Sequence, residues 1–331
     1  VGSEMCIRDR CIAIIAALSG ARLYALIINP ILSSILIFII SFQKKPQKIC
    51  RGFGLQAMKK IFTFSAYQFL FNVINYFSRN LDKLLIGKYM NMSELGYYEK
   101  SYRLMMLPLQ NITHVISPVM HPVFSNFQND LKKLSSSYEK VIRFLAFIGF
   151  PLSVLLWFCA REITLIIFGA HWEPSVPVFQ ILSMSVGIQI ILSTSGSIFQ
   201  AANDTKSLFL CGVFSTIFNI GGLITGLFLF KTLEAVAYCI CITFTINFVL
   251  CYIWMYKITF KQTMTSFWKQ LVSPILMSII LITVLLPINQ LCHYLPILVS
   301  ALIKGISCML VSVLYICLLY TSPSPRDGLL S

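Results

Sequence analysis

Charged residues are scarce in this sequence, and acidic ones are the scarcest. Asp, Glu, Lys and Arg make up 11% of the 331 residues, against about a quarter in a typical soluble domain. The mean hydropathy of +0.80 excludes an ordinary soluble domain, because one core could not hide so many apolar side chains. The net charge of +14 comes from basic residues between apolar runs, as in the cytoplasmic loops of membrane proteins, so we expect no nucleic-acid partner.

The sequence also lacks the short motifs of common enzyme classes. It has no GxSxG nucleophile elbow, no HExxH zinc helix and no phosphate-binding P-loop. The 11 cysteines form no CxxC pair, and most of them lie in apolar runs, where cysteine acts as a small hydrophobic residue. We therefore expect no catalytic residue, no metal site and no cofactor, and we favour transport over chemistry.

The two ends of the chain share an unusual property. Residues 1–9 (VGSEMCIRD) can be encoded by a short DNA whose opposite strand encodes residues 317–325 (CLLYTSPSP). That DNA resembles a transposase-type sequencing adapter. We therefore expect residues 1–10 and 317–331 to be adapter-derived artefacts, and the chain to lack both natural ends.

Long apolar runs fill most of the chain. A run of about 18–25 residues crosses a bilayer as a helix, and nine such runs follow a shorter first one. They span residues 11–19 (the partial one), 22–41, 61–87, 100–125, 139–159, 175–200, 206–230, 233–256, 270–288 and 295–316. The connections are too short for a soluble domain. We predict an all-α fold, a polytopic bundle of about ten transmembrane helices.

The distribution of Lys and Arg predicts how these helices are oriented. One set of alternate connections holds 14 basic residues, at 44–60, 132–143, 206 and 257–269, and the other set holds 8. Cytoplasmic loops are enriched in Lys and Arg, so we expect the first set to face the cytoplasm. Most of the opposing basic residues cluster between residues 79 and 103, which calls for a separate explanation.

A polar stripe runs along the apolar segment 61–87. Its members are three or four residues apart, which places them on one face of a helix. They are Gln68, Asn72, Asn75, Arg79 and Asp82, with Lys83 beside them. Each charge that faces lipid at bilayer depth costs about 2.5–3.5 kcal/mol, so this face is expected to meet protein or water.

The next segment, 100–125, repeats the pattern. Its stripe consists of Glu99, Arg103, Gln110, His114, Ser117 and His121, with Met106 in the one long gap. Pro108, Pro118 and Pro122 interrupt the same segment, and broken membrane helices are tolerated where they line a cavity. Two adjacent polar-faced helices joined by a charged turn indicate the wall of an aqueous, mostly cationic cavity.

A second interpretation of the first stripe stays open. Arg79, Asp82 and Lys83 would then lie beyond the membrane on a solvated helix end, with Arg79 and Asp82 paired. The polar face is uninterrupted from Gln68 onward, which favours the cavity.

Other small or polar residues inside the apolar runs favour structural roles. Gly212, Ser215, Asn219, Gly222 and Gly226 form a small-residue stripe that suits close helix packing. The cluster at 193–197 (STSGS) favours the same role. Lys304 lies in the last apolar run, where a lysine that extends its amine to the membrane surface is favoured over a headgroup contact.

Three parts of the chain resemble a known family. They are residues 75–130, with NLDKLLIGKY, ELGYYEKSYRLMMLPLQNI and HPVFSNFQND, residues 165–182 (LIIFGAHWEPSVPVFQIL) and residues 197–206 (SIFQAANDTK). These motifs are similar to those of Wzx-type lipopolysaccharide and exopolysaccharide flippases. That family belongs to the multidrug/oligosaccharidyl-lipid/polysaccharide exporter superfamily.

The resemblance implies a fold of fourteen helices, in two six-helix bundles and a C-terminal pair, of which this chain lacks about the first four. Residues 11–60 would be a remnant of the N-terminal bundle plus a cytoplasmic loop. Residues 61–256 would be the complete C-terminal six-helix bundle, and residues 270–316 the C-terminal helix pair. This mapping and the charge distribution both place the 44–60 loop in the cytoplasm.

The resemblance also implies a function. Such proteins flip an undecaprenyl-pyrophosphate-linked oligosaccharide from the cytoplasmic to the periplasmic leaflet of the bacterial inner membrane, for O-antigen, capsule or exopolysaccharide synthesis. The expected partners are this lipid-linked glycan and the bilayer, with polysaccharide polymerase machinery as a further candidate. We expect a monomer.

Residue roles carried over from the resemblance fall on the two polar stripes. Arg79, Lys83 and Arg103 would bind the pyrophosphate, because Arg and Lys supply charge-assisted hydrogen bonds to phosphate oxygens. Asp82 would orient these side chains or couple to a cation. The polar lining of the cavity would be Gln68, Asn72, Asn75, Gln110 and His114.

Two other functions compete with the flippase. A drug or cation exporter of the same superfamily would be expected to have an acidic, aromatic cavity, and the basic set Arg79, Lys83 and Arg103 argues against it. A membrane O-antigen polymerase or ligase would need a large periplasmic loop, and no connection here is long enough.

Overall fold

The computed structural model describes residues 34–35, 42–43, 55–125, 127 and 130–321. The chain divides into two compact units, Val1–Met58 and Lys59–Ser331, and nearly all of the described residues belong to the second. The expected helices at 11–19 and 22–41, most of the 11–60 remnant and most of the adapter-like ends therefore lie outside the described residues.

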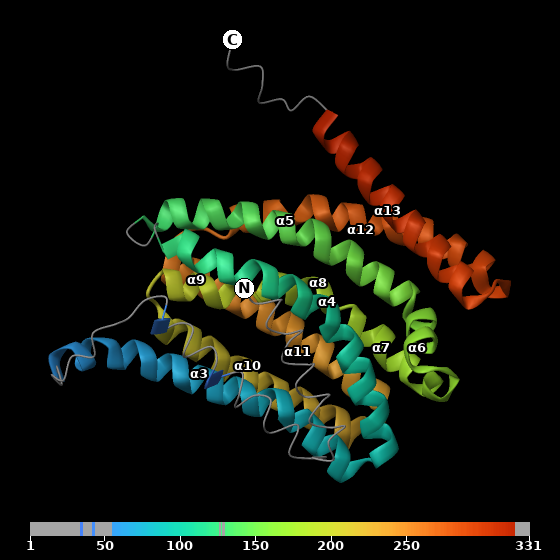
Figure 1. Cartoon of the computed structure of the whole chain (residues 1–331), viewed down its shortest axis with the longest axis horizontal. Helices are drawn as coiled ribbons and strands as arrows, with labels where there is room; N and C mark the ends of the chain where they lie inside the picture. Colours follow the sequence, from blue (N-terminus) through green and yellow to red (C-terminus); the bar gives the residue numbers. More distant parts are fainter. Residues whose placement is uncertain (1–33, 36–41, 44–54, 126, 128–129, 322–331) are drawn as a thin grey trace. The chain divides into compact units, whose positions relative to one another are not determined.

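Each apolar run from residue 61 onward is helical, as predicted (Figure 1). The long helices are α3 (Leu55–Tyr89), α4 (Met92–Ser125), α5 (Leu131–Phe158), α10 (Thr205–Thr225), α11 (Leu233–Trp254), α12 (Thr265–Leu291) and α13 (Ile297–Thr321). Two of them continue as π-helical turns, α10 into η2 (Gly226–Phe230) and α11 into η3 (Met255–Phe260). The prediction of an all-α membrane helix bundle is confirmed.

Five helices in the described part of the chain are long and apolar enough to cross a membrane, or six if one bent segment counts as a single span. The helices that carry the two polar stripes, α3 and α4, are not among these candidates. The stripes place charged and amide side chains within otherwise apolar helices.

The bent segment corresponds to the apolar run 175–200, which was expected to be one helix. It consists of η1 (Ala170–Ser175), α7 (Val176–Ser183), α8 (Val186–Leu192) and α9 (Ser195–Ala201), with a bend of 51° after α7. Hydroxyl groups at both breaks bond carbonyls three residues earlier: Ser185 bonds Leu182 at 2.8 Å, and Thr194 bonds Ile191 at 2.8 Å. Such bonds compete with the helical hydrogen bonds and bend the helix.

The structure bears on two further expectations. Hydroxyls of the 193–197 cluster bond the chain's own carbonyl groups, as with Ser193 on Ile190 at 2.7 Å. They also contact other helices, since Thr113 of α4 donates to Ser193 at 3.1 Å and the Thr194 and Tyr138 hydroxyls lie 3.0 Å apart, which agrees with the expected role in helix packing. The three prolines of α4 were expected to interrupt it, but α4 is continuous (Figure 1). Membrane helices tolerate proline, because neighbouring groups satisfy the backbone atoms that proline leaves free.

The buried core of the bundle lies among α4, α5, α7, α8, α10, α11 and α12. Helix α5 packs along α12 and α8, and α10 packs along α11. Aromatic side chains fill the centre: the rings of Tyr252 and Phe267 stack with centroids 4.5 Å apart, and the Tyr138 and Tyr252 hydroxyls lie 2.7 Å apart.

The predicted small-residue stripe does permit close packing. A Cβ atom on Gly226 would lie 2.8 Å from the Cα atom of Val236 in α11, and one on Gly222 would lie 2.5 Å from Cγ2 of Thr243. A Cβ atom on Gly212 would lie 2.7 Å from a ring carbon of Phe71 in α3. The glycines of this stripe therefore set the distance of α10 from its two neighbours.

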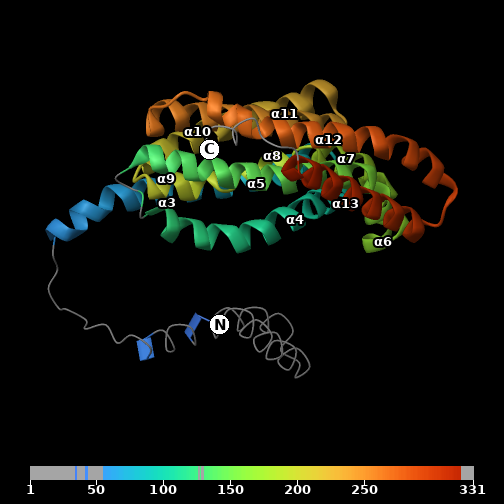
Figure 2. The same ribbon diagram turned by 90° about the horizontal axis from the view of Figure 1, so that it is seen from above.

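The C-terminal helices α12 and α13 lie together against one side of the bundle (Figures 1 and 2). A buried ion pair joins α13 to the bundle, between Lys304 and Glu162 of α6 (Ala160–Phe168). The amine of Lys304 also donates to the Phe158 carbonyl at 3.0 Å, and the Ser300 hydroxyl donates to Glu162 at 2.6 Å. Only 3% of Lys304 is exposed, so the expectation that this lysine extends to the membrane surface is wrong.

The close contact at Gly226 gives a first prediction. We expect Gly226→Ala to destabilise the protein by about 1–3 kcal/mol, because the new methyl group meets the backbone of α11, which cannot move aside. The matched control is Gly221→Ala, where no atom lies within 4 Å of the added Cβ. Thermal unfolding in detergent micelles measures both, and equal melting temperatures for the two variants would contradict the packing.

The buried ion pair gives a second prediction. Lys304→Met leaves the Glu162 carboxylate buried without its cation, and breaking such a pair costs about 3–5 kcal/mol. The double variant Glu162→Gln with Lys304→Met should recover most of that loss, since no unpaired charge remains. Chemical unfolding of the three proteins in the same detergent tests this; a single variant as stable as the parent would show that the pair does not hold α13.

Candidate functional site

The two polar stripes belong to a helical hairpin. Helix α3 ends at Tyr89 and α4 begins at Met92, and the Leu95 amide donates to the Asn91 carbonyl at 2.9 Å in the first turn of α4. The helices approach closely here, since a Cβ atom on Gly87 would lie 3.0 Å from Cδ2 of Leu95. The hairpin therefore holds the ends of both stripes side by side.

Asp82 lies inside this hairpin and is buried, with 5% of its surface exposed. The Tyr98 hydroxyl of α4 donates to its Oδ2 atom at 2.7 Å, and the Lys83 amide donates to Oδ1 at 2.8 Å. A solvated helix end was the alternative interpretation of this residue, and the burial of Asp82 contradicts it. The side chain of Arg79 is not among the described ones.

Lys83 and Glu99 connect the same two helices at the surface. The Lys83 amine lies 3.1 Å from Oε1 of Glu99, and 35% and 55% of the two side chains are exposed. A pair this exposed adds little stability. Lys83 thus remains accessible to another anion.

Asn75 and Asp82 line a cavity inside the bundle, with a volume of about 280 Å³. The other polar lining comes from α8, α9, α10 and α11: Gln189, Ser193, Ser195, Ser215, Asn219 and Asn247. Phe71 and Tyr102 complete its apolar parts beside α3 and α4. Polar and apolar side chains share its lining, and among the described side chains Asp82 is the one charged group.

The remaining predicted residues of α4 lie elsewhere. Arg103, Gln110 and His114 are exposed, and none of them lines the interior cavity. Their neighbours Leu104, Met105 and Leu109 are buried in the core. Helix α4 therefore turns an apolar side inward, and its exposed side carries the three polar residues together with Leu107 and Val115.

The α3 stripe is divided between these two surroundings. Asn72 is exposed, whereas Gln68 accepts a hydrogen bond at 3.0 Å from the Gln200 amide of α9. The sequence treated the two stripes as one cavity wall. The structure places Asn75 and Asp82 inside the bundle and Arg103, Gln110 and His114 on its outer face.

The sequence reasoning missed several residues of the interior cavity. Gln189 lies within the apolar run VGIQIIL, and Asn247 lies within TINFVL. A lone amide in an apolar span is costly unless it has a partner or meets water, and this signal could have identified both. Tyr98 carries no such signal, since its role depends on its contact with Asp82.

Comparison with known proteins connects this bundle to polysaccharide synthesis. The sequence profile of a family described as polysaccharide biosynthesis protein matches residues 5–177. The teichuronic acid biosynthesis protein TuaB of Bacillus subtilis is 24% identical over 233 residues, which are 68% of this chain and 46% of the relative. The lipopolysaccharide biosynthesis protein WzxC of Escherichia coli is 25% identical over 174 residues, 53% of this chain and 35% of the relative.

Another relative carries transport in its name. The succinoglycan biosynthesis transport protein ExoT of Rhizobium meliloti is 23% identical over 264 residues, 78% of this chain and 52% of the relative. The chain thus spans about half or less of the length of these curated relatives. Their names agree with the resemblance found in the sequence motifs, which is confirmed.

A solved structure shows the same fold. The lipid II flippase MurJ in its inward closed conformation superposes with a TM-score of 0.66 over 97% of this chain and 66% of that chain, at 17% sequence identity. The likeness shows that these helices adopt the fold of that protein.

The buried carboxylate gives a third prediction. Tyr98→Phe removes the hydroxyl that donates to Asp82, and we expect a loss of about 1–3 kcal/mol in stability, because the carboxylate keeps its burial and loses a partner. Tyr97→Phe is the matched control, since it removes the neighbouring hydroxyl and keeps the ring beside Trp172. Combining Tyr98→Phe with Asp82→Asn should cost less than the sum of the single changes, and additive losses in thermal unfolding would refute the contact.

Proposed function

Because the chain belongs to the polysaccharide biosynthesis protein family, we propose that it moves a polyprenyl-pyrophosphate-linked oligosaccharide from the cytoplasmic to the periplasmic leaflet. The chain is a multi-pass protein of the bacterial inner (plasma) membrane. We propose that it acts as a transporter without catalytic residues, as a monomer, and that the polymerase machinery of the same pathway receives its product.

The observation that carries this proposal is a set of exposed polar residues on the outer face of α4, where they lie among exposed apolar ones such as Val115. Arg103, Gln110 and His114 are exposed on a helix whose other side is packed in the core. A charged side chain facing lipid is costly, so this face is suited to water and to a polar substrate. A sugar-pyrophosphate headgroup needs such a surface, while its lipid tail stays in the bilayer.

Basic residues at one end of this face would hold the pyrophosphate. Arg103 is exposed, and Lys83 is partly exposed in a pair that an anion can replace. We assign the headgroup to these two and to Arg79, since guanidinium and ammonium groups form charge-assisted hydrogen bonds with phosphate oxygens. Gln110 and His114 further along this face, and the exposed Asn72 of α3, would contact the sugar.

Asp82 has a different place in the proposal. It is buried and bonded to Tyr98, away from the exposed face that carries Arg103. Two roles were expected for it, orientation of the basic residues and coupling to a cation. The interior cavity beside it offers the amide oxygens of Asn75, Gln189 and Asn247, which supports the second role.

Binding of a short substrate analogue tests the proposal directly. We expect farnesyl pyrophosphate to bind the protein in lipid nanodiscs, and Arg103→Glu to weaken that binding about tenfold or more, through the loss of one charge-assisted contact and added repulsion. Arg143→Glu is the matched control, an exposed arginine on α5 that should leave the affinity unchanged. Fluorescence anisotropy with a labelled analogue measures all three proteins.

Two results would argue against this assignment. Equal affinity of the parent and Arg103→Glu, with both proteins folded, would remove the headgroup site from α4. Saturable binding of the cation ethidium without binding of farnesyl pyrophosphate would favour the drug or cation exporter.

A further inference from the structure

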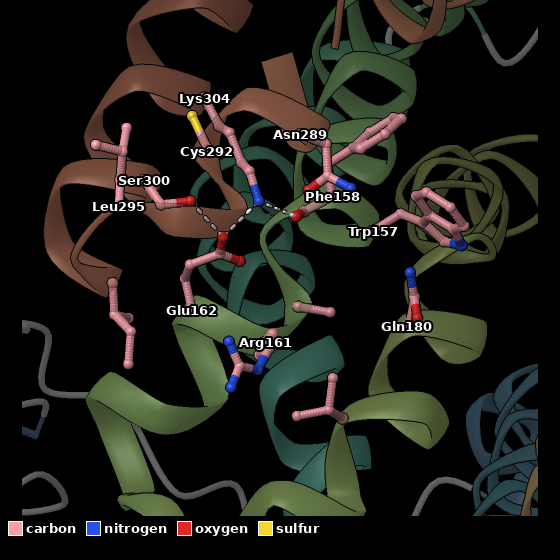
Figure 3. Close-up of a pocket in the computed structure, with 13 residues that line it drawn as sticks. Trp157, Phe158, Arg161, Glu162, Gln180, Asn289, Cys292, Leu295, Ser300 and Lys304 are labelled. Atoms are coloured by element: carbon pink, nitrogen blue, oxygen red, sulfur yellow. Dashed lines mark hydrogen bonds and ion pairs between the residues drawn. The ribbon is translucent and has the colours of Figure 1, made fainter. Parts of the chain in front are cut away.

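A second cavity lies where the C-terminal helices meet the bundle (Figure 3), with a volume of about 270 Å³. Its lining comes from the end of α5, from α6 and α7, from the end of α12 and from the start of α13. The polar and aromatic residues that matter here are Trp157, Glu162, Gln180, Asn289, Ser300 and Lys304. All of them lie at the helix ends that the distribution of basic residues predicts to face the periplasm.

The buried ion pair of this cavity leaves hydrogen-bonding capacity unused. Oε1 of Glu162 accepts from Lys304 and Ser300, whereas the buried Oε2 atom has no partner among the described residues. An ammonium group has three N–H donors, and that of Lys304 uses two, on Glu162 and on the Phe158 carbonyl. A missing hydrogen bond at a buried carboxylate is costly. A ligand that donates to Oε2 of Glu162 and accepts from the third N–H of Lys304 would therefore bind favourably here.

The charges of the cavity select the kind of ligand. A cation at Oε2 would lie beside the Lys304 amine and be repelled by it. An anion has no proton to donate to Oε2, and it would face the Glu162 carboxylate. Arg161, the other charged residue of the lining, lies 3.2 Å from Glu173, and more than half of each side chain is exposed, so solvent screens its charge from the buried pair. A neutral group with hydroxyls can donate to Oε2 and accept from Lys304 at once.

The opposite side of the cavity suits a ring. Figure 3 shows Trp157 and Gln180 across from Glu162 and Ser300, with Asn289 between them in this view. The half-buried indole of Trp157 offers an apolar surface to the C–H face of a sugar ring, and the amides of Gln180 and Asn289 each supply a donor and an acceptor for hydroxyls. The volume is just below the range of about 300–1,000 Å³ of drug-sized sites, which suits a single monosaccharide.

We propose that this cavity, between α6 and the C-terminal helix pair, is a carbohydrate-binding site for one neutral sugar residue. Trp157 packs against the sugar ring, and Gln180 and Asn289 form hydrogen bonds with its hydroxyls. One further hydroxyl donates to Oε2 of Glu162 and accepts from the Lys304 amine. The choice of a sugar over other polyols rests on the proposed function, in which a glycan arrives on the periplasmic side. The site is separate from the headgroup residues of α4.

Fluorescence of Trp157 reports on the site directly. The protein is prepared in nanodiscs with Trp172, Trp254 and Trp268 changed to Phe, so that Trp157 is the only tryptophan. Glucose, galactose and N-acetylglucosamine are titrated to about 100 mM, a range that detects affinities weaker than about −4 kcal/mol. Glycerol, inorganic phosphate and sodium chloride are titrated in parallel.

We expect at least one hexose to change the emission in a saturable way, and Asn289→Ala to weaken its binding about tenfold. Gln290→Ala is the matched control, because this residue neighbours Asn289 on α12, is also exposed and does not line the cavity. It should bind as the parent does. Neither substitution touches the core, and the far-ultraviolet circular dichroism of both variants confirms that they are folded.

Three results would overturn the proposal. The first is an unchanged emission with every hexose, which would indicate that only water occupies the cavity. The second is equal hexose binding by the parent and Asn289→Ala. The third is a response of the emission to phosphate or sodium ions without a response to sugars. The outcome is distinguishable from that of the proposed function: loss of farnesyl pyrophosphate binding with retained hexose binding would remove the transport assignment and keep this site.

Discussion

A polar group buried away from water is costly unless it is hydrogen-bonded, so most buried charged groups must find a partner within the chain. Three buried acidic residues follow this constraint, and each is bonded by donors from another part of the sequence. Asp82 is bonded by Tyr98, Glu139 by Tyr256 at 3.1 Å and Ser266 at 2.5 Å, and Glu162 by Lys304 and Ser300. These contacts join α3 to α4, α5 to η3 and α12, and α6 to α13.

The same constraint sorts the polar residues of α3 and α4 into two groups. Those that point into the bundle have partners or line the interior cavity, as Asp82 and Asn75 do. Those on the outer face of α4, such as Arg103 and His114, are exposed. An exposed charged residue on a helix packed among membrane spans has to meet water or another polar surface. We therefore propose this second group as the path of a polar headgroup.

Much of the fold follows from hydrophobic run length alone, and the described helices match the predicted segments. The close contacts at Gly222 and Gly226 also follow from their spacing. The break in the segment 170–201 does not follow from run length. Hydropathy carries no information on the hydrogen bonds that the Ser185 and Thr194 hydroxyls form with backbone carbonyls. Proline was the more obvious break signal, yet α4 stays continuous.

The candidate site was predictable in part. Helical spacing identified the polar stripe of α4. The sequence placed that stripe on the wall of a cavity, whereas Arg103, Gln110 and His114 are exposed on the outer face of the helix. Spacing on one helix cannot separate the buried Asp82 from the exposed Asn72, because the burial of Asp82 depends on its contact with Tyr98 of the next helix. The pairing of Lys304 with Glu162 spans 142 positions, and only tertiary structure brings these residues together. From the sequence alone, Lys304 was therefore predicted to extend its amine to the membrane surface.

Accessibility of the α4 face tests the central claim most directly. A nitroxide label at His114 should collide more with a water-soluble nickel chelate than with oxygen, in the protein reconstituted into liposomes. A label at Ile217 of α10, an apolar residue that is 59% exposed, should show the reverse. If His114 instead behaves like Ile217, its face lies in hydrocarbon, and the proposed path for a polar headgroup along α4 does not exist.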